Sequence, residues 1–269
     1  MIKEIHWFDL DYTLWNTNSK WWIIDKMNPK NFILKISQYE GQLILNGNYI
    51  EDNNKITYNG LTGWISNELI TEIKQKKDID LKNIGLSFRE YVDPKLIQKQ
   101  SENLFIYIDR LQDIKTKSIN VLTARPNKEA HKELLNDLTN NLKKINININ
   151  EAIFVNDLNN KKLSGSTPER KLQILIQSLI GYEIKNNSFN SMMCDSCDIC
   201  YFYDDEDKNI DQCKFINDKI NLLLTKTQPW LKQRIEENLK FNKKKLITNL
   251  VTSNEMNPFI TEIIEIKLN

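Results

Sequence analysis

Glycine is scarce in this chain, with seven residues among 269. The sequence contains neither Gly-x-Gly-x-x-Gly nor the Gly-Lys-Ser/Thr end of a P-loop. Both motifs need glycine because it lets the backbone approach a nucleotide phosphate closely. The sequence therefore excludes the usual dinucleotide-binding fingerprint and the P-loop NTPases as function classes.

The chain also lacks an excess of charge and long apolar runs. It has 37 Lys and Arg against 36 Asp and Glu, a formal net charge of +1, which removes the general electrostatic argument for a nucleic-acid binder. No apolar run reaches the roughly 20 residues of a membrane helix. Asp9 and Asp11 interrupt the N-terminal apolar stretch where a signal peptide would need its core. We expect a cytoplasmic protein with no membrane partner.

Histidine and cysteine are few as well. The two histidines, His6 and His131, lie far apart in sequence, which gives little support to Ser-His-Asp or Cys-His catalysis. The four cysteines are Cys194, Cys197, Cys200 and Cys213, and the first three form a C-x-x-C-x-x-C run. This spacing leaves a structural zinc site as an alternative. Free thiols are the simpler interpretation, because Cys200 lies inside an apolar, strand-like run.

What the sequence does have is a pair of acids at the end of its first apolar run. Residues 4–9 predict a buried strand that leads into Asp9 and Asp11, and Thr13 follows. Side chains two apart in a strand point to the same face, so the two carboxylates would lie close together. Two like charges held that close cost free energy unless a cation or a shared proton compensates. A hard divalent ion such as Mg²⁺ is the simplest compensation.

Strand and helix patterns alternate in the rest of the chain. Further strands are expected at 118–123, 152–155 and 199–203, and helices at about 126–144, 167–182 and 214–245. Such alternation predicts an α/β fold with a doubly wound, mostly parallel, Rossmann-like sheet. The expected core covers about 1–15 and 94–245, a C-terminal extension covers about 246–269, and the whole forms one domain.

The interval 16–93 is expected to be an α+β insertion, resembling a cap, after the first strand. Its pattern predicts a hairpin from 42–50 and 55–58, and a helix over 64–76 that starts near Ser66. Early Glu and late Lys residues in that helix match the helix dipole.

Polar residues end several of the predicted strands. Asp9 and Asp11 end the first, Thr123 ends the second, and Asp204 and Asp205 end the last. Parallel strands place their C-terminal ends at one edge of a sheet, so these groups are expected to converge. Lys171 lies near the start of a predicted helix.

This set of residues resembles the four motifs of the haloacid dehalogenase (HAD) superfamily of Mg²⁺-dependent phosphotransferases. Asp9, Asp11 and Thr13 match its Asp-x-Asp-x-Thr motif, and Thr123 matches the hydroxyl residue that ends a strand. Lys171 is the best match to its lysine, in competition with Arg170, Lys161 and Lys162, and the acidic pair Asp204-Asp205 matches its fourth motif. The resemblance reaches from residue 4 to about 210, apart from the interval before Thr123.

A narrower resemblance is to the HAD-like domain named for the Swiss Army Knife RNA repair proteins. The run from Val121 to Arg125 is similar to its Leu-Thr-Gly-Arg motif, and tryptophans follow the first acidic motif. Two departures are Ala124 in place of the glycine and Glu206 in place of an arginine in the fourth motif. The second departure puts in doubt any substrate contact that this arginine makes in the family.

The resemblance implies a phosphatase with a covalent intermediate. Asp9 would attack phosphorus, and Asp11 would first protonate the leaving oxygen and then deprotonate water. Thr123 would donate a hydrogen bond to a phosphoryl oxygen, and Lys171 would neutralise charge on it. Thr13 and Arg125 are assigned to substrate binding.

Mg²⁺ is the implied cofactor. Its implied ligands are Asp9, Asp11 through the backbone carbonyl, and Asp204, Asp205 or both, while Asp207 could share or replace a metal role. The expected partner is a phosphorylated substrate, either a small molecule such as a nucleotide or a nucleic-acid end. The alternative from another function class is a HAD-like binding protein that has lost turnover.

Overall fold

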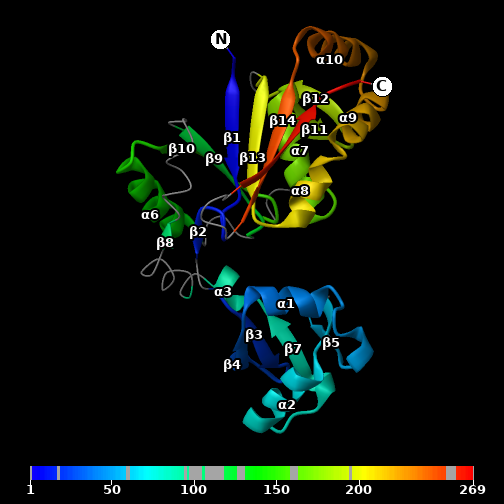
Figure 1. Ribbon diagram of the computed structural model, residues 1–269. Coiled ribbons are helices and arrows are strands. Elements are labelled where there is room, and N and C mark those ends of the chain that lie inside the picture. Colours follow the sequence, from blue (N-terminus) through cyan, green and yellow to red (C-terminus); the bar gives the residue numbers. More distant parts are fainter. Residues whose placement is uncertain are drawn as a thin grey trace. The chain divides into compact units, whose positions relative to one another are not determined.

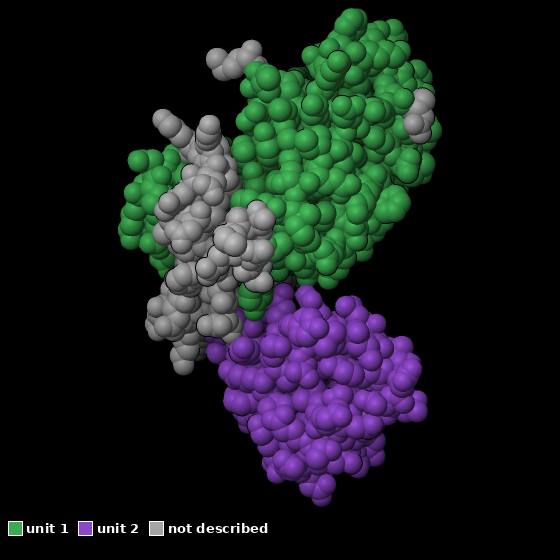
Figure 2. All heavy atoms as spheres, in the orientation of Figure 1, with its two compact units in different colours: residues 1–17, 104–269 green, residues 18–103 purple. Residues whose placement is uncertain are grey.

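The computed structural model describes residues 2–16, 19–58, 61–93, 96, 105–106, 118–125, 131–157, 163–193, 196–252 and 259–268. The chain divides into two compact units (Figures 1 and 2). Unit 1 comprises residues 1–17 and 104–269, and unit 2 comprises residues 18–103. Unit 2 is therefore an insertion into unit 1 in the sequence sense, where the expected insertion covers 16–93.

Unit 1 is built on a six-stranded sheet in the order β10-β9-β1-β13-β14-β15. Its strands are β1 (Glu4–Phe8), β9 (Ser118–Thr123), β10 (Asn148–Phe154), β13 (Ile199–Asp204), β14 (Lys245–Val251) and β15 (Phe259–Glu265). All neighbours pair in parallel except β14 and β15, which are antiparallel. Numbered along the chain, the five parallel strands have the order 3-2-1-4-5, which is compatible with a Rossmann-like fold.

Among the described residues, five helices pack around this sheet and its hairpin (Figure 1). They are α6 (Lys132–Lys143), α7 (Thr167–Ile180), α8 (Asp207–Cys213), α9 (Ile216–Thr225) and α10 (Pro229–Phe241). In α6, Leu134, Leu138 and Leu142 are buried at four-residue spacing. In α7 every residue from Lys171 to Ile180 is buried, so this helix runs through the largest apolar core of the unit.

Two short pairings complete unit 1. A hairpin is formed by β11 (Tyr182–Lys185) and β12 (Ser188–Met192), and β2 (Trp15–Asn16) pairs with β8 (Phe105–Ile106). The indole of Trp7 on β1 donates to the hydroxyl of Ser178 on α7 at 3.0 Å, so the central strand and the central helix are joined by a buried hydrogen bond.

Unit 2 has an α+β architecture with a core of its own. A three-stranded antiparallel sheet has the order β4-β3-β7, from β3 (Trp21–Asp25), β4 (Asn28–Ile36) and β7 (Ile84–Ser87). A hairpin of β5 (Lys55–Tyr58) and β6 (Leu61–Trp64) contacts α1 (Gln38–Leu45), while α2 (Asn67–Lys76) contacts β4 and the short α3 (Arg89–Val92) contacts β3. The single-turn helices Ile50–Asp52 and Leu81–Asn83 link these elements. Its buried core includes Trp21, Ile23, Ile44, Ile73 and Leu86.

The α/β class and the mostly parallel sheet are confirmed, and the strands expected at 4–9, 118–123, 152–155 and 199–203 are present. The helix that begins after Ser66 is also confirmed, because the Ser66 hydroxyl accepts a hydrogen bond from the Leu69 N–H.

Three expectations were wrong. The segment expected as the first strand of a hairpin, 42–50, contains the end of α1, and β5 pairs with β6 instead. The helix expected over 214–245 is divided into α9 and α10, because Pro229 opens a new helix. The expected C-terminal extension is no appendage, since β14 and β15 are two strands of the main sheet.

Of the helix expected from 126 to 144, residues 126–130 lie outside the described part of the chain, as do 97–104 and 107–117. In the part that is described, no helix has both the length and the apolar character needed to cross a lipid bilayer.

Candidate active site

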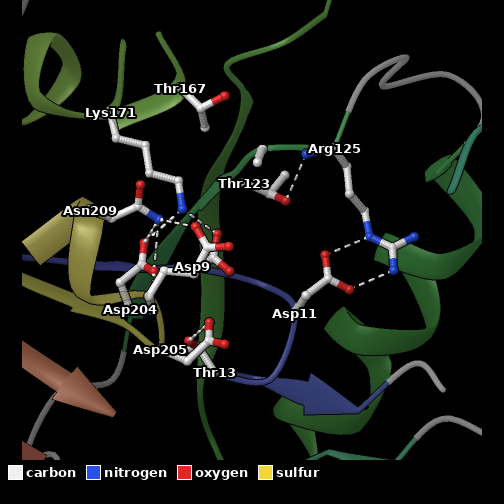
Figure 3. Close-up of polar contacts among 12 residues, drawn as sticks. Asp9, Asp11, Thr13, Thr123, Arg125, Thr167, Lys171, Asp204, Asp205 and Asn209 are labelled. Atoms are coloured by element: carbon white, nitrogen blue, oxygen red, sulfur yellow. Dashed lines mark hydrogen bonds and ion pairs between the residues drawn. The ribbon is translucent and has the colours of Figure 1, made fainter. Parts of the chain in front are cut away.

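A buried lysine bridges two buried aspartates at the C-terminal edge of the parallel sheet. The Nζ atom of Lys171 lies 2.6 Å from Asp9 Oδ1 and 2.7 Å from Asp204 Oδ2. Lys171 is 2% exposed, Asp9 6% and Asp204 0%. Figure 3 shows the three side chains directed toward one another. Charges buried this deeply are retained only when they are paired, so these three residues form one electrostatic unit.

Adjacent parallel strands explain why the two acids meet. β1 pairs with β13 so that Phe8 is opposite Tyr203, and the next residues along these strands are Asp9 and Asp204. The Asp9 N–H donates to the Tyr203 carbonyl at 2.8 Å, which extends the ladder by one bond. The register therefore places both carboxylates side by side, as expected for residues that end neighbouring parallel strands.

Lys171 reaches the pair from the first turns of α7. This helix begins with a capping box: the Glu169 carboxylate accepts from the N–H and the hydroxyl of Ser166 at 2.8 and 2.9 Å. Ser166 is the N-cap, and Pro168 lies in the first turn. The cap fixes the start of the helix and with it the position of Lys171.

A third carboxylate, Asp205, joins the group. One oxygen from each of Asp9, Asp204 and Asp205 lies within 4.8 Å of the others. The Thr13 hydroxyl donates to Asp205 Oδ1 at 3.3 Å. The turn between β1 and Thr13 includes Tyr12 in the left-handed region, at φ 56°, a conformation that is uncommon for a residue with a side chain. This turn brings the Thr13 hydroxyl within hydrogen-bond distance of the Asp205 carboxylate.

The pKa values of the cluster respond to burial and to the surplus of carboxylates. Burial alone would lower the pKa of Lys171, but Asp204 and Asp9 outweigh it and hold that pKa above its ordinary value. Burial raises the pKa of Asp9 well above its usual range, opposed by Lys171 and reinforced by the other carboxylates. The pKa of Asp205 is raised to about 7 by burial and then by Asp204 and Glu206. A further cation would lower the free energy of this arrangement.

Asn209, which the sequence analysis did not identify, holds Asp204 in place. Its Nδ2 atom lies 2.9 and 3.0 Å from the two Asp204 oxygens and 3.1 Å from Glu206 Oε2. The Glu206 N–H also donates to Asp204 at 3.0 Å. The Oδ1 atom of Asn209 is buried and has no hydrogen-bond partner among the described residues. The only sequence signal was its place in the first turns after the acidic strand end.

The residues present fit a magnesium ion. Asp9, Asp204 and Asp205 supply a set of oxygen donors, which is the ligand type that Mg²⁺ prefers. Three carboxylates against the single ammonium of Lys171 leave a formal charge of −2, which a divalent cation would balance. The carboxylate of Asp11 is not one of the three, whereas the ligand that the resemblance implies at this residue is a backbone oxygen.

Asp11 is instead paired with Arg125. Arg125 Nε lies 2.8 Å from Asp11 Oδ2 and Nη2 lies 2.5 Å from Oδ1, a bidentate ion pair. Arg125 is 2% exposed, and its Nη1 atom lies 3.1 Å from Nε2 of His131, which is 0% exposed. Figure 3 shows the Asp11 carboxylate turned toward Arg125. From the sequence Arg125 is expected to bind substrate, whereas in the structure its guanidinium contacts Asp11, the second acid of the motif.

Thr123 ends β9 close to these groups and is fully buried. Its hydroxyl oxygen accepts from the Arg125 N–H at 3.2 Å, and a hydroxyl can still donate its own proton. A single sheet edge therefore carries Asp9, Thr123 and Asp204 on three neighbouring strands (Figure 3).

Of the alternative cations, Arg170 contacts backbone oxygens of Gly165 and Val155 and the side chain of Asn156. Lys161 and Lys162 lie outside the described residues. Asp207, the alternative metal ligand, is exposed at the start of α8 and is not part of the carboxylate group. Of the described candidates for this role, Lys171 is therefore the one that contacts Asp9 and Asp204.

The cysteines do not form a comparable cluster in the described part of the chain. Cys197, Cys200 and Cys213 are buried free thiols, and Cys194 lies outside the described residues. The carboxylates are the one group of three or more metal-binding side chains found within 4.8 Å of each other among the described residues. The described cysteines thus give no support to a structural zinc site.

Comparisons with known proteins identified no matching family model, no matching curated protein and no matching solved structure.

Proposed function

We propose that this chain is a Mg²⁺-dependent phosphomonoester hydrolase that works through an aspartyl-phosphate on Asp9. The observation that carries the proposal is the buried Asp9–Lys171–Asp204 contact, with Asp205 completing a group of three carboxylates. We further propose that the sheet is a doubly wound sheet of the HAD type, with residues 18–103 as its cap-like insertion. The order of its five parallel strands and the position of the acids support this proposal.

In the first half-reaction an Asp9 oxygen attacks phosphorus, a bond to Asp9 forms, and the bond to the leaving oxygen breaks. Lys171 keeps a positive charge beside Asp9, where negative charge on the phosphoryl group would otherwise repel the nucleophile. Thr123 supplies a hydroxyl donor from the neighbouring strand. The preorganised donor and cation favour the transition state because they need little rearrangement during the reaction.

Asp11 carries the proton in both half-reactions. It gives a proton to the leaving oxygen, and it takes one from the water that then attacks the aspartyl-phosphate. Asp9 is thereby regenerated, and free phosphate leaves. The same residue serves both steps because the proton that it loses in the first is returned in the second.

Asp9, Asp204 and Asp205 would hold the magnesium ion, together with the backbone oxygen of Asp11. When bound, the ion supplies positive charge that lowers the repulsion between the carboxylates and the phosphate dianion. Asn209 and Thr13 orient two of these ligands through the hydrogen bonds described above.

A nucleotide, another small phosphate or a nucleic-acid end is the proposed substrate class, and a screen over these three kinds of phosphomonoester distinguishes them. The near-neutral net charge favours none of them.

The proposal is tested by the variant Asp9→Asn with a nitrophenyl phosphate and Mg²⁺. We expect kcat to fall by about 10⁴-fold or more, because an amide cannot replace the attacking carboxylate. Asp211→Asn is a matched control, since Asp211 is exposed on α8 and pairs with Lys214 at the surface. Full activity in Asp9→Asn would contradict the assignment. Inactivity of the unaltered protein on a broad phosphate panel would favour a binding protein instead.

A further inference from the structure

Lys244 is a buried lysine that has no part in the proposed reaction. It is 2% exposed and lies between α10 and β14. Its Nζ atom donates to the Cys197 carbonyl at 2.7 Å and to the Ser196 hydroxyl oxygen at 2.9 Å. Within the described part of the chain it forms no ion pair with a carboxylate. Burial lowers its pKa, opposed by Cys197 and Asp198. A buried charge without a counter-ion costs free energy, so an anion near Lys244 would be favoured.

A cavity of about 100 Å³ lies next to Ser196. Its walls come from the C-terminal end of α7, from the hairpin of β11 and β12, and from α10. The polar side chains that line it are those of Tyr182, Ser196, Arg234 and Asn238, and none of its described lining residues is acidic. One water molecule needs roughly 10–15 Å³ of such space, so the cavity has room for a group of the size of phosphate or a small carboxylate.

The polar side chains of this cavity can all donate hydrogen bonds. The guanidinium of Arg234 can only donate, and it has no ion pair or hydrogen bond with any described residue. The Ser196 hydroxyl oxygen accepts from Lys244, which leaves the hydroxyl proton for a ligand. Tyr182 and Asn238 add a phenol and an amide. A guanidinium with neighbouring donors matches the oxygen atoms of phosphate and carboxylate groups.

The C-terminal end of α7 by itself disfavours an anion, because the last carbonyl groups of a helix carry partial negative charge. Two of these carbonyls already accept hydrogen bonds. The Gln177 carbonyl accepts from the Gly181 N–H at 2.7 Å, and the Ser178 carbonyl accepts from the Cys197 N–H at 3.1 Å. Against this partial charge stand two full positive charges, one in the cavity wall and one a single hydrogen bond behind it. The balance therefore favours an anion.

We propose that this cavity binds a small oxyanion, with Arg234 and the Ser196 hydroxyl as donors and Lys244 supplying positive charge from behind Ser196. Phosphate and small carboxylates share the chemistry that the cavity recognises. Ser196 and Lys244 precede β13 and β14, whereas Asp204 ends β13, so the cavity and the carboxylate cluster lie at opposite edges of the sheet. The length of β13 separates the two edges by roughly 20 Å. The oxyanion site is thus distinct from the proposed phosphatase site and does not depend on it.

The test is calorimetric titration of the metal-free, full chain with sodium phosphate and, separately, with sodium acetate, at constant ionic strength in chloride. We expect saturable binding of at least one anion with a Kd below about 5 mM. Arg234→Gln should raise that Kd at least about 10-fold, because the charged donor is lost. Lys240→Gln is the matched control, since Lys240 is exposed on the same helix outside the cavity. It should change the Kd by less than about 2-fold, because solvent and salt screen an exposed charge.

Lys244→Met tests the charge behind Ser196. We expect it to raise the Kd at least about 3-fold, although Lys244 does not line the cavity. If this variant does not fold, Arg234→Gln decides the question alone.

NMR during the same titration locates the anion. The Arg234 Nε–H signal and the Ser196 backbone amide signal should shift with the Kd that calorimetry gives. Binding of phosphate alone, of acetate alone or of both supports the proposal and identifies the shape of the anion. The proposal is overturned if neither anion saturates the protein at about 50 mM, if Arg234→Gln and Lys240→Gln weaken binding equally or not at all, or if the Arg234 and Ser196 signals do not move. Because no turnover is measured, this result stands whether or not the chain hydrolyses a phosphomonoester.

Discussion

At the scale of single residues, Lys171 lowers the free energy of the acidic cluster, because its charge offsets the repulsion between Asp9 and Asp204. Its ammonium contacts Asp9 and Asp204. Because all three residues are buried, water screens the repulsion between the two carboxylates only weakly. Burial of Asp205 is the main physical reason that its pKa is raised to about 7, and the neighbouring carboxylates of Asp204 and Glu206 add to the effect. The site therefore holds buried carboxylates at a cost in electrostatic free energy, as functional sites commonly do.

The raised pKa of Asp205 predicts a pH-dependent stability. Between about pH 4 and 7 the folded, metal-free protein holds a proton at Asp205 that the unfolded chain has released, so stability falls as pH rises through this window. Asp205→Asn keeps an acceptor for Thr13 and removes the titration. We expect the metal-free variant to be more stable than the unaltered protein at pH 8, on the order of 1–3 kcal/mol, and equally stable at pH 4.

Chemical denaturation at both pH values measures this difference, with Asp211→Asn as the surface control. Added Mg²⁺ should stabilise the unaltered protein at pH 8 and have much less effect on Asp205→Asn, because a ligand is lost. An equal stability of the two proteins at pH 8 would show that the Asp205 carboxylate is not under electrostatic strain.

At the scale of elements, α7 is the helix whose start sets the site. The capping box of Ser166 and Glu169 satisfies N–H groups in the first turn, and Lys171 lies two residues after Glu169. Gly165, the residue immediately before the N-cap Ser166, has φ 94°, and a Cβ atom on it would lie 2.4 Å from the Glu169 carboxylate. The turn therefore requires glycine in order to deliver the helix at this position.

Loss of the cap is expected to destabilise the protein. Glu169→Ala removes two hydrogen bonds to Ser166 and should lower the free energy of unfolding of unit 1 by about 1 kcal/mol. Glu236→Ala on α10 is the matched control, since it removes only a half-exposed pair with Lys232 at 3.8 Å, which is worth about 0.3 kcal/mol. Urea denaturation compares the variants, and similar losses in both would contradict the importance of the cap.

The residues of the site that lie at strand ends could be predicted from the sequence. Asp9, Thr123 and Asp204 follow apolar runs, and parallel strands bring such ends together whatever the sequence distance. Arg125 and Asp11 are 114 residues apart, and their pairing depends on side-chain directions that no local pattern encodes. Asn209 was missed for the same reason, since it contacts Asp204 from another element.

The elements show a similar limit. The segment of α1 was taken for a strand because Leu and Ile dominate its end, although Ser37 and Glu40 have the spacing of a capping box. The Ser37 hydroxyl accepts from the Glu40 N–H at 3.0 Å, so this signal was present in the sequence. Packing against another element also determines where this helix lies. A Cβ atom on Gly41 would lie 2.0 Å from the Trp21 ring, so the helix packs against β3 where only glycine fits.

At the scale of the whole molecule, the described residues of each unit include an apolar core of their own. One comprises residues of unit 1 around α7, and the other lies within residues 18–103. The proposed metal ligands all belong to unit 1. A change in one core should therefore affect the stability of its own unit first.

Ile73→Ala tests this division, because Ile73 is fully buried in the core of unit 2. We expect it to cost about 2–4 kcal/mol of the stability of that unit. Hydrogen exchange followed by mass spectrometry should show faster exchange in peptides from 18–103 and unchanged protection of unit 1. Mg²⁺ should slow exchange around Asp9 and Asp204 and leave unit 2 unaffected. Equal acceleration throughout the chain would mean that the two units unfold as one.

The most direct test of the central claim is to look for the phosphoryl group on Asp9. The unaltered protein is mixed with nitrophenyl phosphate and Mg²⁺, quenched in acid within the first turnovers, digested and analysed by mass spectrometry. The account predicts that the peptide containing Asp9 gains one phosphoryl group, and that Asp9→Asn shows neither this adduct nor turnover. Turnover without any adduct on this peptide, retained in Asp9→Asn, would contradict it.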